Sequence, residues 1–411
     1  MLAIDKGPRV REKPFPVRRL FGEAEKQAAV ELFDEAIETG EVFGYNGSRE
    51  KAYEEAFADF HGGGFADAVN SGTSALFVAL GALDLEPFGE VIIPPITDPG
   101  GAMPVPLLNL VPVIADAVPN SFNTGAEQID AELTEHTRAI IVAHIAGELV
   151  DMDPVLELAR SRGIPVIEDV AQAHGAQYKG HMAGTMGDIA AFSTMSGKHH
   201  ATGAQGGVVF TKNEELYWEA KRFADRGKPF NLDGAAGNVR MGLNLNSNEL
   251  SAAIGLVQLA KLGAIAAGRL AAVEGIRKGL SDAKVVSIGW QVPNTEPSYW
   301  FLRMQLDLAR LKVGKTEFCE ALTAEGIPNS SSYRYIPSEA PWFKDRRTFG
   351  RSGYPWSSPD YKGDRNRTFP CPNAITATET CFSLKVNENY GQEEVEDIVE
   401  ALLKVEQAYR V

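Results

Sequence analysis

Apolar and polar positions follow one another in a regular order along the first part of the chain. Residues 23–39 and 49–60 have the spacing of amphipathic helices, with a turn between them at Gly44 and Gly47. From residue 65 onward, short apolar runs alternate with helical patterns. The apolar runs are FADAVN, EVIIP, VPVIAD, RAIIVAHIAG, IPVIEDV, DIAAFS and GGVVFT, and the helical stretches are SGTSALFVALGAL, GGAMPVPLLNL, DPVLELARSRG and EELYWEAKRFA. This alternation predicts crossover connections and a mainly parallel sheet, which binds ligands at the carboxyl ends of its strands.

A long helix is predicted where this alternation ends. Leu250, Ile254 and Val257 fall at i, i+4 and i+7, so they share one helical face. Asn246, with Glu249 three residues later, has the arrangement of a helix start, and we expect Asn246 to be the N-cap. This helix is expected to bridge two domains.

The rest of the chain predicts a second, smaller unit. PSYWFLRMQLDL is strand-like, whereas KTEFCEALTAEG and EEVEDIVEALLKVEQAY are helical. We therefore expect an N-terminal arm and large domain over residues 1–271 and a small C-terminal domain over residues 272–411. Within the latter, residues 329–370 are rich in Pro, Gly, Tyr, Trp and Arg and predict a long ordered loop, a kind of segment that is often functional. The first 20 residues predict an extended arm.

Composition excludes several classes of protein. The net charge is −15, with 55 acidic and 40 basic residues, which argues against a broad nucleic-acid surface but leaves room for a local anion pocket. Cys319, Cys371 and Cys381 match no zinc or iron–sulfur spacing and are expected to be reduced. Neither a signal-peptide core nor a membrane-spanning stretch is evident. We expect a cytoplasmic protein with no nucleic-acid or membrane partner.

Three motifs carry candidate chemistry, and the first is NSGTSALFVAL at residues 70–80. A turn of small residues follows a predicted strand and opens a helix there. The free N–H groups at a helix N-terminus favour a phosphate. Ser and Thr also cap helices that bind no ligand, so the motif alone leaves both interpretations open.

The second motif is VIEDVAQAHGA, in which a strand ends in Glu168 and Asp169. A carboxylate at this edge of the sheet could pair with a protonated pyridine nitrogen. Taken alone, the motif fits a solvated acidic strand end better.

The third motif, GDIAAFSTMSGKHHATGAQGGVVFT, places Lys198 in a loop of small residues between two buried strands. A lysine held there could act as an amine nucleophile toward a carbonyl cofactor, although a lone lysine is usually solvated. His199 and His200 are adjacent and do not present two ligands conveniently to one ion. Because no HExxH or CxxC motif supports them, we expect no metal site.

In their order and spacing these segments resemble the DegT/DnrJ/StrS sugar aminotransferases, a branch of the fold-type I enzymes that use pyridoxal 5'-phosphate (PLP). The resemblance runs from SGTSAL through IPVIEDVAQAHGAQYKG and GDIAAFS to LNLNSNELSAAIGLVQL and NYGQEEVEDIVEAL. It implies an α/β fold, with a large domain built on a mainly parallel sheet and a smaller C-terminal α/β domain. It also implies a homodimer with shared active sites.

The resemblance assigns roles to individual residues. It implies that Lys198 carries PLP as a Schiff base, that Asp169 pairs with the pyridine nitrogen and that Gln172 lies beside the phenolic oxygen. The implied phosphate ligands are Gly72, Thr73, Ser193 and, from the neighbouring subunit, Asn244.

Some positions depart from the family pattern. An aromatic residue that covers the cofactor ring is common in the family, and Asp98 stands at that position here. Asp98 could be a turn residue before Pro99, could bind substrate hydroxyls as part of the cofactor site, or could leave the ring to another side chain. Asn246 stands where the family usually has Arg, and the loop after Lys198 is also unusual. These departures bear on the substrate more than on the cofactor.

The implied reaction moves an amino group from an amino acid, glutamate or glutamine, to a keto-sugar, a nucleotide-linked keto-sugar or a ketocyclitol. A PLP-dependent sugar dehydratase of the same family is one alternative, but dehydratases typically have His at the position of Lys198, and here His199 comes one residue later. A non-catalytic regulator is another alternative. Loss of Lys198 or Asp169 would indicate it, and both are present.

Overall fold

The apolar runs of the N-terminal part pair into a seven-stranded sheet in the computed structural model, which describes residues 1–333 and 335–411. The strand order is β1-β9-β8-β5-β4-β2-β3. Only β9 runs against its neighbours in this sheet, so the sheet is mainly parallel, as predicted. The strands are β1 (Phe65–Val69), β2 (Glu90–Ile93), β3 (Val111–Ile114), β4 (Thr137–Ala143), β5 (Val166–Asp169), β8 (Ile189–Ser193) and β9 (Gly207–Thr211).

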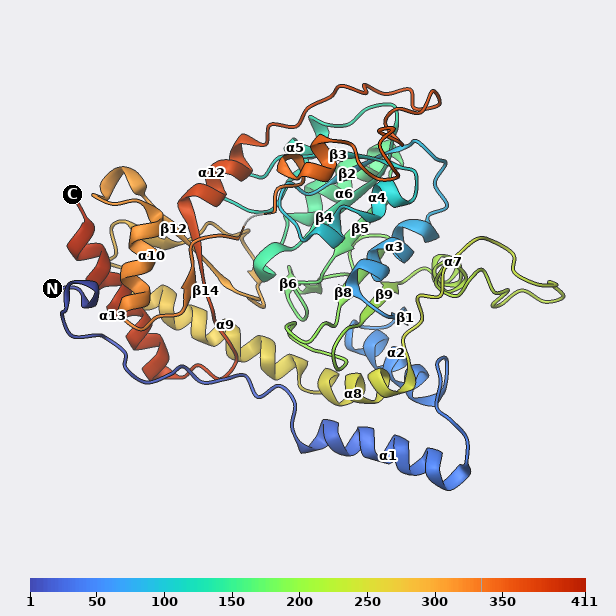
Figure 1. Ribbon diagram of the computed structural model, residues 1–411, viewed down its shortest axis with the longest axis horizontal. Coiled ribbons are helices and arrows are strands. Elements are labelled where there is room, and N and C mark those ends of the chain that lie inside the picture. The colour runs from blue at the N-terminus through green and yellow to red at the C-terminus, as the bar shows by residue number, and fades with distance from the viewer. Residues whose placement is uncertain (334) are drawn as a thin grey trace.

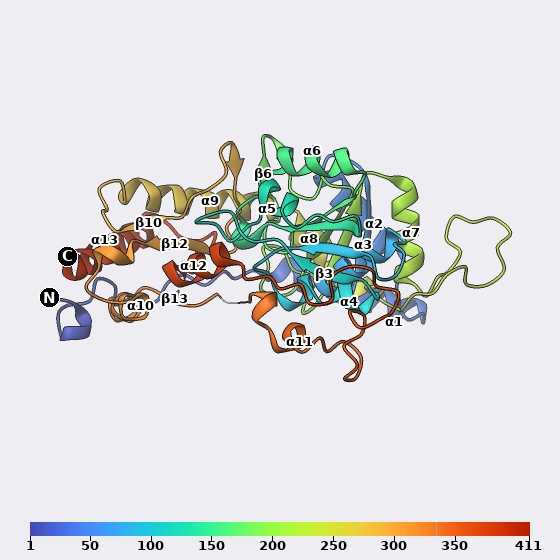
Figure 2. The same ribbon diagram turned by 90° about the horizontal axis from the view of Figure 1, so that it is seen from above.

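Helices cover both faces of this sheet, which explains why its strands are apolar on both sides. Helices α4 and α6 lie on opposite sides of it (Figure 2). Helix α3 packs on β8 and β9, and α2 packs on β1. The helices of this part are α1 (Glu23–Thr39), α2 (Ser48–Phe60), α3 (Gly72–Ala82), α4 (Pro104–Leu107), α5 (Ala126–Asp130), α6 (Met152–Arg162) and α7 (Glu214–Ala224), with the short 3-10 helices η2 (Pro99–Gly101) and η3 (Ile145–Gly147).

A second, antiparallel sheet of order β10-β12-β14-β13 has its own apolar core, to which Leu2 of the N-terminal arm contributes. Both chain termini lie at this end of the molecule (Figure 1). The elements are β10 (Val286–Ile288), β12 (Leu302–Leu306), β13 (Asn329–Ser330), β14 (Cys381–Leu384), η4 (Leu308–Arg310), α10 (Lys315–Ala324), α12 (Pro372–Thr380) and α13 (Gln392–Tyr409). A small third sheet joins β6 (Gln177–Tyr178), β7 (His181–Met182) and β11 (Thr295–Glu296). The domain division at residue 272 stays a prediction.

The predicted long helix is two helices, α8 (Glu249–Leu259) and α9 (Leu262–Gly279), bent by 51°. Helix α9 extends from the part of the molecule that holds the seven-stranded sheet to the part that holds the antiparallel sheet (Figure 1). The prediction that Asn246 caps this helix is wrong. Asn248 is the N-cap, because Asn246 is held in an extended bridge to Val69. The carboxylate of Glu249 instead accepts the backbone amides of Arg49 and Glu50 and so caps α2.

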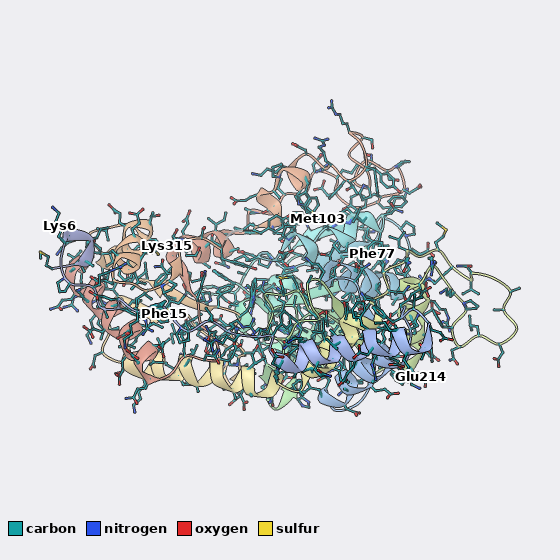
Figure 3. The ribbon with its side chains drawn as sticks, turned by 60° about the horizontal axis from the view of Figure 1, so that its bottom comes forward. Lys6, Phe15, Phe77, Met103, Glu214 and Lys315 are labelled. Atoms are coloured by element: carbon teal, nitrogen blue, oxygen red, sulfur yellow. The ribbon has the colours of Figure 1, made fainter. Side chains whose placement is uncertain are left out.

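The N-terminal arm is extended apart from the single 3-10 turn η1 (Ala3–Asp5). Lys6 and Phe15 of the arm lie at the far end of the molecule from Glu214 of α7 (Figure 3). The predicted loop over residues 329–370 contains only β13, η5 (Pro337–Glu339) and α11 (Pro341–Lys344) as regular elements among its described residues. It is anchored to the large sheet, where the Tyr361 hydroxyl donates to Glu90 Oε1 at 2.7 Å.

Two further observations concern the described residues. All three cysteines are free and buried. No single helix among these residues is both long and apolar enough to cross a membrane, and the bent pair α8–α9 passes that test by length and composition only. A cytoplasmic location and the lack of nucleic-acid and membrane partners stay predictions.

Candidate active site

Lys198 lies in the loop between β8 and β9, at the edge of the sheet where the parallel strands end. Its side chain is buried, with 6% of its surface exposed. The Nζ atom lies 3.9 Å from the ring centroid of Trp300. Burial lowers the pKa of Lys198, and the charges of Asp169 and Asp98 oppose this shift. Within the described residues no ion pair joins Lys198 to either carboxylate, and burial disfavours the charged form of its amine relative to the neutral, nucleophilic form.

Glu168 and Asp169 point to opposite sides of β5, because neighbouring residues of a strand alternate. Glu168 is fully buried and accepts hydrogen bonds from His144 Nε2 at 3.0 Å and from the amides of Gly184, Met186 and Gly187. Burial alone would raise the pKa of Glu168, but the bonds from His144 and the amides lower it below its ordinary value. Glu168 therefore holds the turn after β7 in place and has no capacity left for a ligand.

Asp169 is the carboxylate that faces the site. Its Oδ1 accepts the amide of Ala171 at 3.0 Å, and Oδ2 makes no hydrogen bond within the described part of the chain. Burial raises the pKa of Asp169, whereas the charge of Lys198 lowers it. A cationic partner at Oδ2 would oppose the effect of burial further and keep the carboxylate ionised.

A Glu168→Gln substitution tests this division of roles. We expect a loss of about 1–3 kcal/mol in the free energy of unfolding, because the neutral amide cannot replace a carboxylate that accepts four donors. A group whose pKa is lowered by folding contributes stability above its unfolded pKa and loses it as the pH falls. The difference between wild type and variant, measured by thermal melts, should therefore shrink below about pH 4. An equal difference at all pH values would mean that Glu168 is not ionised in the fold.

Three chain segments meet at the N-terminus of α3. Ser71 caps this helix by accepting the amide of Ser74 at 3.0 Å. A Cβ atom added to Gly72 would lie 2.5 Å from Ser193 Cβ, so these two residues touch. A Cβ atom on Gly100 would come within 2.2 Å of Thr73 Oγ1. The hydroxyls of Thr73 and Ser193 make no hydrogen bond to other described residues. Free hydroxyls beside a helix N-terminus form a site of the kind that binds phosphate.

Gln172 is fixed at both ends of its amide. Its Oε1 accepts the amide of Ala146 at 2.8 Å, and its Nε2 donates to the hydroxyl of Tyr333 at 2.6 Å. Tyr333 comes from the loop over residues 329–370. The composition of that segment predicts a functional loop, but it does not identify Tyr333 as a site residue. Burial raises the pKa of Tyr333, and so do the charges of Asp98 and Asp169, which shows that it lies near both carboxylates.

Asp98 caps a turn and also faces the site. Its Oδ1 accepts the amide of Gly100 at 2.9 Å, which matches the turn interpretation. Its side chain is exposed, and its charge raises the pKa of Asp169 and of Tyr333. A role for Asp98 in substrate or cofactor binding stays a prediction.

Aromatic side chains that the sequence did not assign to the site surround Tyr333. The ring centroids of Phe301, Phe122 and Trp300 lie 4.9, 6.2 and 6.4 Å from that of Tyr333. The run PSYWF predicts part of a strand, but β12 begins only at Leu302. Trp300 precedes this strand and faces the lysine loop.

Asn244 is not brought to the other predicted residues. Its side chain is exposed, and Oδ1 accepts from Asn246 Nδ2 at 2.7 Å. Among the described residues, no hydrogen bond joins it to the lysine loop or to α3. Its assignment to a neighbouring subunit's site stays a prediction.

The two histidines after the lysine are buried and turned away from one another. His199 Nε2 bonds the carbonyl of Ser298 at 3.0 Å, and His200 Nε2 bonds the hydroxyl of Tyr53 at 2.8 Å. Burial lowers the pKa of His200 to about 3, so it is neutral. Over residues 1–333 and 335–411, no three His, Cys, Asp or Glu side chains are grouped as a metal site requires.

Comparison with known proteins places this chain in one class, the aminotransferases. The family model described as the DegT/DnrJ/EryC1/StrS aminotransferase family matches residues 23–403, and the chain belongs to this family. The predicted family and fold class are therefore confirmed.

Two of the similar proteins have names that refer to sugar or cyclitol chemistry. GDP-perosamine synthase of Caulobacter vibrioides is 39% identical, over 51% of this chain and 56% of that protein. L-glutamine:2-deoxy-scyllo-inosose aminotransferase of Streptomyces kanamyceticus is 31% identical, over 81% of this chain and 80% of that protein. Among solved structures, an aminotransferase from Psychrobacter cryohalolentis superposes with a TM-score of 0.82 at 27% identity and covers 96% of this chain and 99% of its own.

Proposed function

We propose that this aminotransferase uses PLP to move an amino group from glutamine or glutamate to a polyhydroxylated ketone, either a keto-sugar, free or nucleotide-linked, or a ketocyclitol. The observation that carries the proposal is the convergence of three groups at one edge of the sheet. These are the buried amine of Lys198, the free carboxylate oxygen of Asp169 and the hydroxyl-lined N-terminus of α3.

The residues present fit this cofactor. Lys198 would hold it covalently, and Asp169 would face the ring nitrogen. Gly72, Thr73 and Ser193 would hold the phosphate. Gly72 lies so close to Ser193 that a side chain at position 72 would not fit, which explains the glycine there. When bound, PLP supplies an electron sink that makes a proton on the amino donor removable.

The side chains of this chain perform the remaining work. The amine of Lys198, once free, moves a proton as general base and then as general acid, and burial keeps a neutral fraction of it available. The charge of Asp169 would retain the proton on the ring nitrogen of the bound cofactor. The amide of Gln172 is fixed by Ala146 and Tyr333, so it would keep a set orientation beside the cofactor.

The structure gives reasons to prefer transamination over the two alternatives. A dehydratase would need a histidine in place of the lysine amine, and the ring of His199 bonds the Ser298 carbonyl instead. A non-catalytic protein would have no need for a buried lysine that forms no ion pair within the described residues and is close enough to Asp169 to sense its charge. The burial of Lys198 and the orientation of Asp169 by the Ala171 amide support a catalytic role for both.

A donor and acceptor panel tests the function. Holoenzyme is mixed with L-glutamine or L-glutamate and with free ketocyclitols, free keto-sugars and nucleotide-linked keto-sugars, and the amine product is measured by mass spectrometry. We expect transfer to at least one of these ketones. Release of water from a sugar without amine formation would support the dehydratase instead, and no reaction at all would support a regulator.

Exposed apolar side chains support a homodimer with shared sites. Val30, Phe33 and Ile37 form an exposed stripe on α1, and the segment after α7 carries Met241, which is 90% exposed, and Leu243. This segment projects from the body (Figure 1). Apolar patches of this kind mark protein interfaces.

We expect a mass of about twice 44.5 kDa by light scattering. Phe33→Glu or Met241→Glu should shift the mass toward the monomer and abolish activity, because Asn244 would then no longer reach a partner's site. Trp290→Glu, which changes an exposed aromatic residue near the second core, is the matched control. An active monomer would contradict the shared site.

Asp98→Ala tests whether this carboxylate binds substrate. We expect the KM for the ketone to rise about tenfold or more, the scale of a lost hydrogen bond to a charged group, with cofactor affinity nearly unchanged. Asp98→Asn, which keeps the turn cap to Gly100, should show whether the charge or the cap matters. If Asp98→Ala releases PLP and leaves the KM unchanged, Asp98 belongs to the cofactor site alone.

A further inference from the structure

Among the described residues, the close contact of the Lys198 amine is with an aromatic ring. Nζ lies 3.9 Å from the centroid of Trp300, a distance at which a cation is attracted to the face of an indole. Asp169 and Asp98 act on the amine only through their charge, and no carboxylate lies within 4.0 Å of it in the described chain. The charge of Lys198 also acts on His174, which burial keeps neutral by lowering its pKa.

Trp300 is held in this position by the lysine loop itself. Its Nε1 donates to the carbonyl of Gly197, the residue before the lysine, at 3.0 Å. Its backbone amide donates to the carbonyl of Ala146 at 2.9 Å. The ring is therefore tied to the loop that carries the amine and to the turn that fixes Gln172.

The backbone that places Trp300 is strained. Tyr299, directly before it, has φ 44°, and Ala146, in the 3-10 helix η3 that follows β4, has φ 64°. Neither is a glycine, and residues other than glycine rarely adopt these angles. Gly147, with φ 83°, is required between them, since a Cβ atom there would lie 2.5 Å from the Tyr299 amide. Strain of this kind concentrates at functional sites.

One carboxylate joins the two sides of this contact. Glu388 bonds Arg18 of the N-terminal arm and Arg269 of α9, each at 2.9 Å. Arg18 donates to the carbonyl of Lys198 at 2.7 Å, and Arg269 donates to that of Tyr299 at 2.8 Å. The lysine loop and the Trp300 segment are thus fixed relative to each other by a single ion network that also involves both ends of the chain.

We propose that Trp300 is a positioning residue that receives the ammonium group of Lys198 whenever the amine is not joined to the cofactor. The proposal rests on the proposed function for the chemistry of the lysine. The ring keeps the free ammonium from turning to Asp169 or Asp98. An ion pair with either would draw the amine away from the carbon where it must move a proton. The Trp300 ring also stabilises the protonated form of the Lys198 amine, which burial disfavours.

The pKa of the free amine is the direct readout. Holoenzyme treated with L-glutamate is converted to its aminated form, in which Lys198 is free. Competitive labelling with trace acetic anhydride across a pH series, quantified on the Lys198 peptide, then gives the pKa of that amine. Trp300→Leu, which keeps the site apolar, should lower this pKa by roughly half to one unit, the scale of one buried cation–π contact. Trp300→Phe, which retains a ring, should recover part of the shift, and Trp290→Leu should have no effect.

The kinetics should change in the same way. In single turnovers of the aminated form with 2-oxoglutarate, Trp300→Leu should move the acidic limb of the pH profile to lower pH. It should also reduce the plateau rate several-fold, with the KM changed less than twofold. An unchanged or raised pKa in Trp300→Leu, with normal cofactor absorbance and folding, would overturn the role of Trp300. If wild-type holoenzyme is not aminated by glutamate or glutamine at all, the proposed function fails and not this inference.

Discussion

Replacing Lys198 with alanine is expected to abolish the visible absorbance of the bound cofactor imine and to reduce transamination by at least roughly 10²–10⁴-fold, the range for loss of acid–base catalysis alone. The variant loses both the covalent bond to PLP and the group that moves the proton. The fold should survive, because the Lys198 side chain makes no ion pair with the described residues and its loop is held by the Arg18 guanidinium, which donates to the backbone carbonyls of Lys198 and His199. Absorbance and single-turnover rates measure the two effects separately.

Lys179→Ala is the matched control. Lys179 is an exposed lysine that forms an ion pair with Asp153 at 2.5 Å and lies outside the loop that carries Lys198. We expect this variant to keep full absorbance and activity. Wild-type absorbance in Lys198→Ala, or its loss in Lys179→Ala, would show that the lysine has been misassigned.

Asp169→Asn is expected to lower kcat/KM on the order of a hundredfold or more, the scale for removal of a preorganised charge. The amide keeps the shape of the side chain and its bond with the Ala171 amide, but it cannot hold a proton on the ring nitrogen. The cofactor should still bind, since Lys198 and the hydroxyl-lined N-terminus of α3 are unchanged.

Asp153→Asn, a change of the same chemistry at an exposed site, controls for the loss of one charge. A near-normal rate for Asp169→Asn would mean that this carboxylate is only a strand end in solvent.

Much of the fold was predictable because buried parallel strands leave a strong signal. Runs such as EVIIP and DIAAFS are apolar throughout, and β2 and β8 are buried at every position. The ends of parallel strands meet at one edge of the sheet, so motifs far apart in sequence, at Gly72, Asp169 and Ser193, were expected together. Gly72 does lie against Ser193, and Asp169 is close enough to Lys198 for the charge of each to act on the pKa of the other.

The features that the sequence did not predict depend on contacts between segments that are distant along the chain. Asn246 has the local sequence of a helix cap, yet pairing with Val69 moves the start of α8 to Asn248. The face of Leu250, Ile254 and Val257 is only half-buried in one chain, although its spacing predicts a core. An amphipathic pattern identifies an apolar face but does not say which surface covers it.

The aromatic side of the site was hidden for the same reason. Trp300 and Tyr333 lie more than a hundred residues after the lysine or its neighbouring carboxylate and have no motif of their own. They reach the site because the loop over residues 329–370 returns to the large sheet and because the strained turn at Tyr299 directs the ring toward Lys198. Neither long-range return can be read from local periodicity.

Reduction of wild-type holoenzyme with borohydride, followed by digestion and mass spectrometry of the pyridoxyl label, identifies the lysine that holds PLP. We expect one labelled peptide, with the label on Lys198. A label on any other lysine, or a protein that binds PLP without forming a reducible bond, would contradict this expectation.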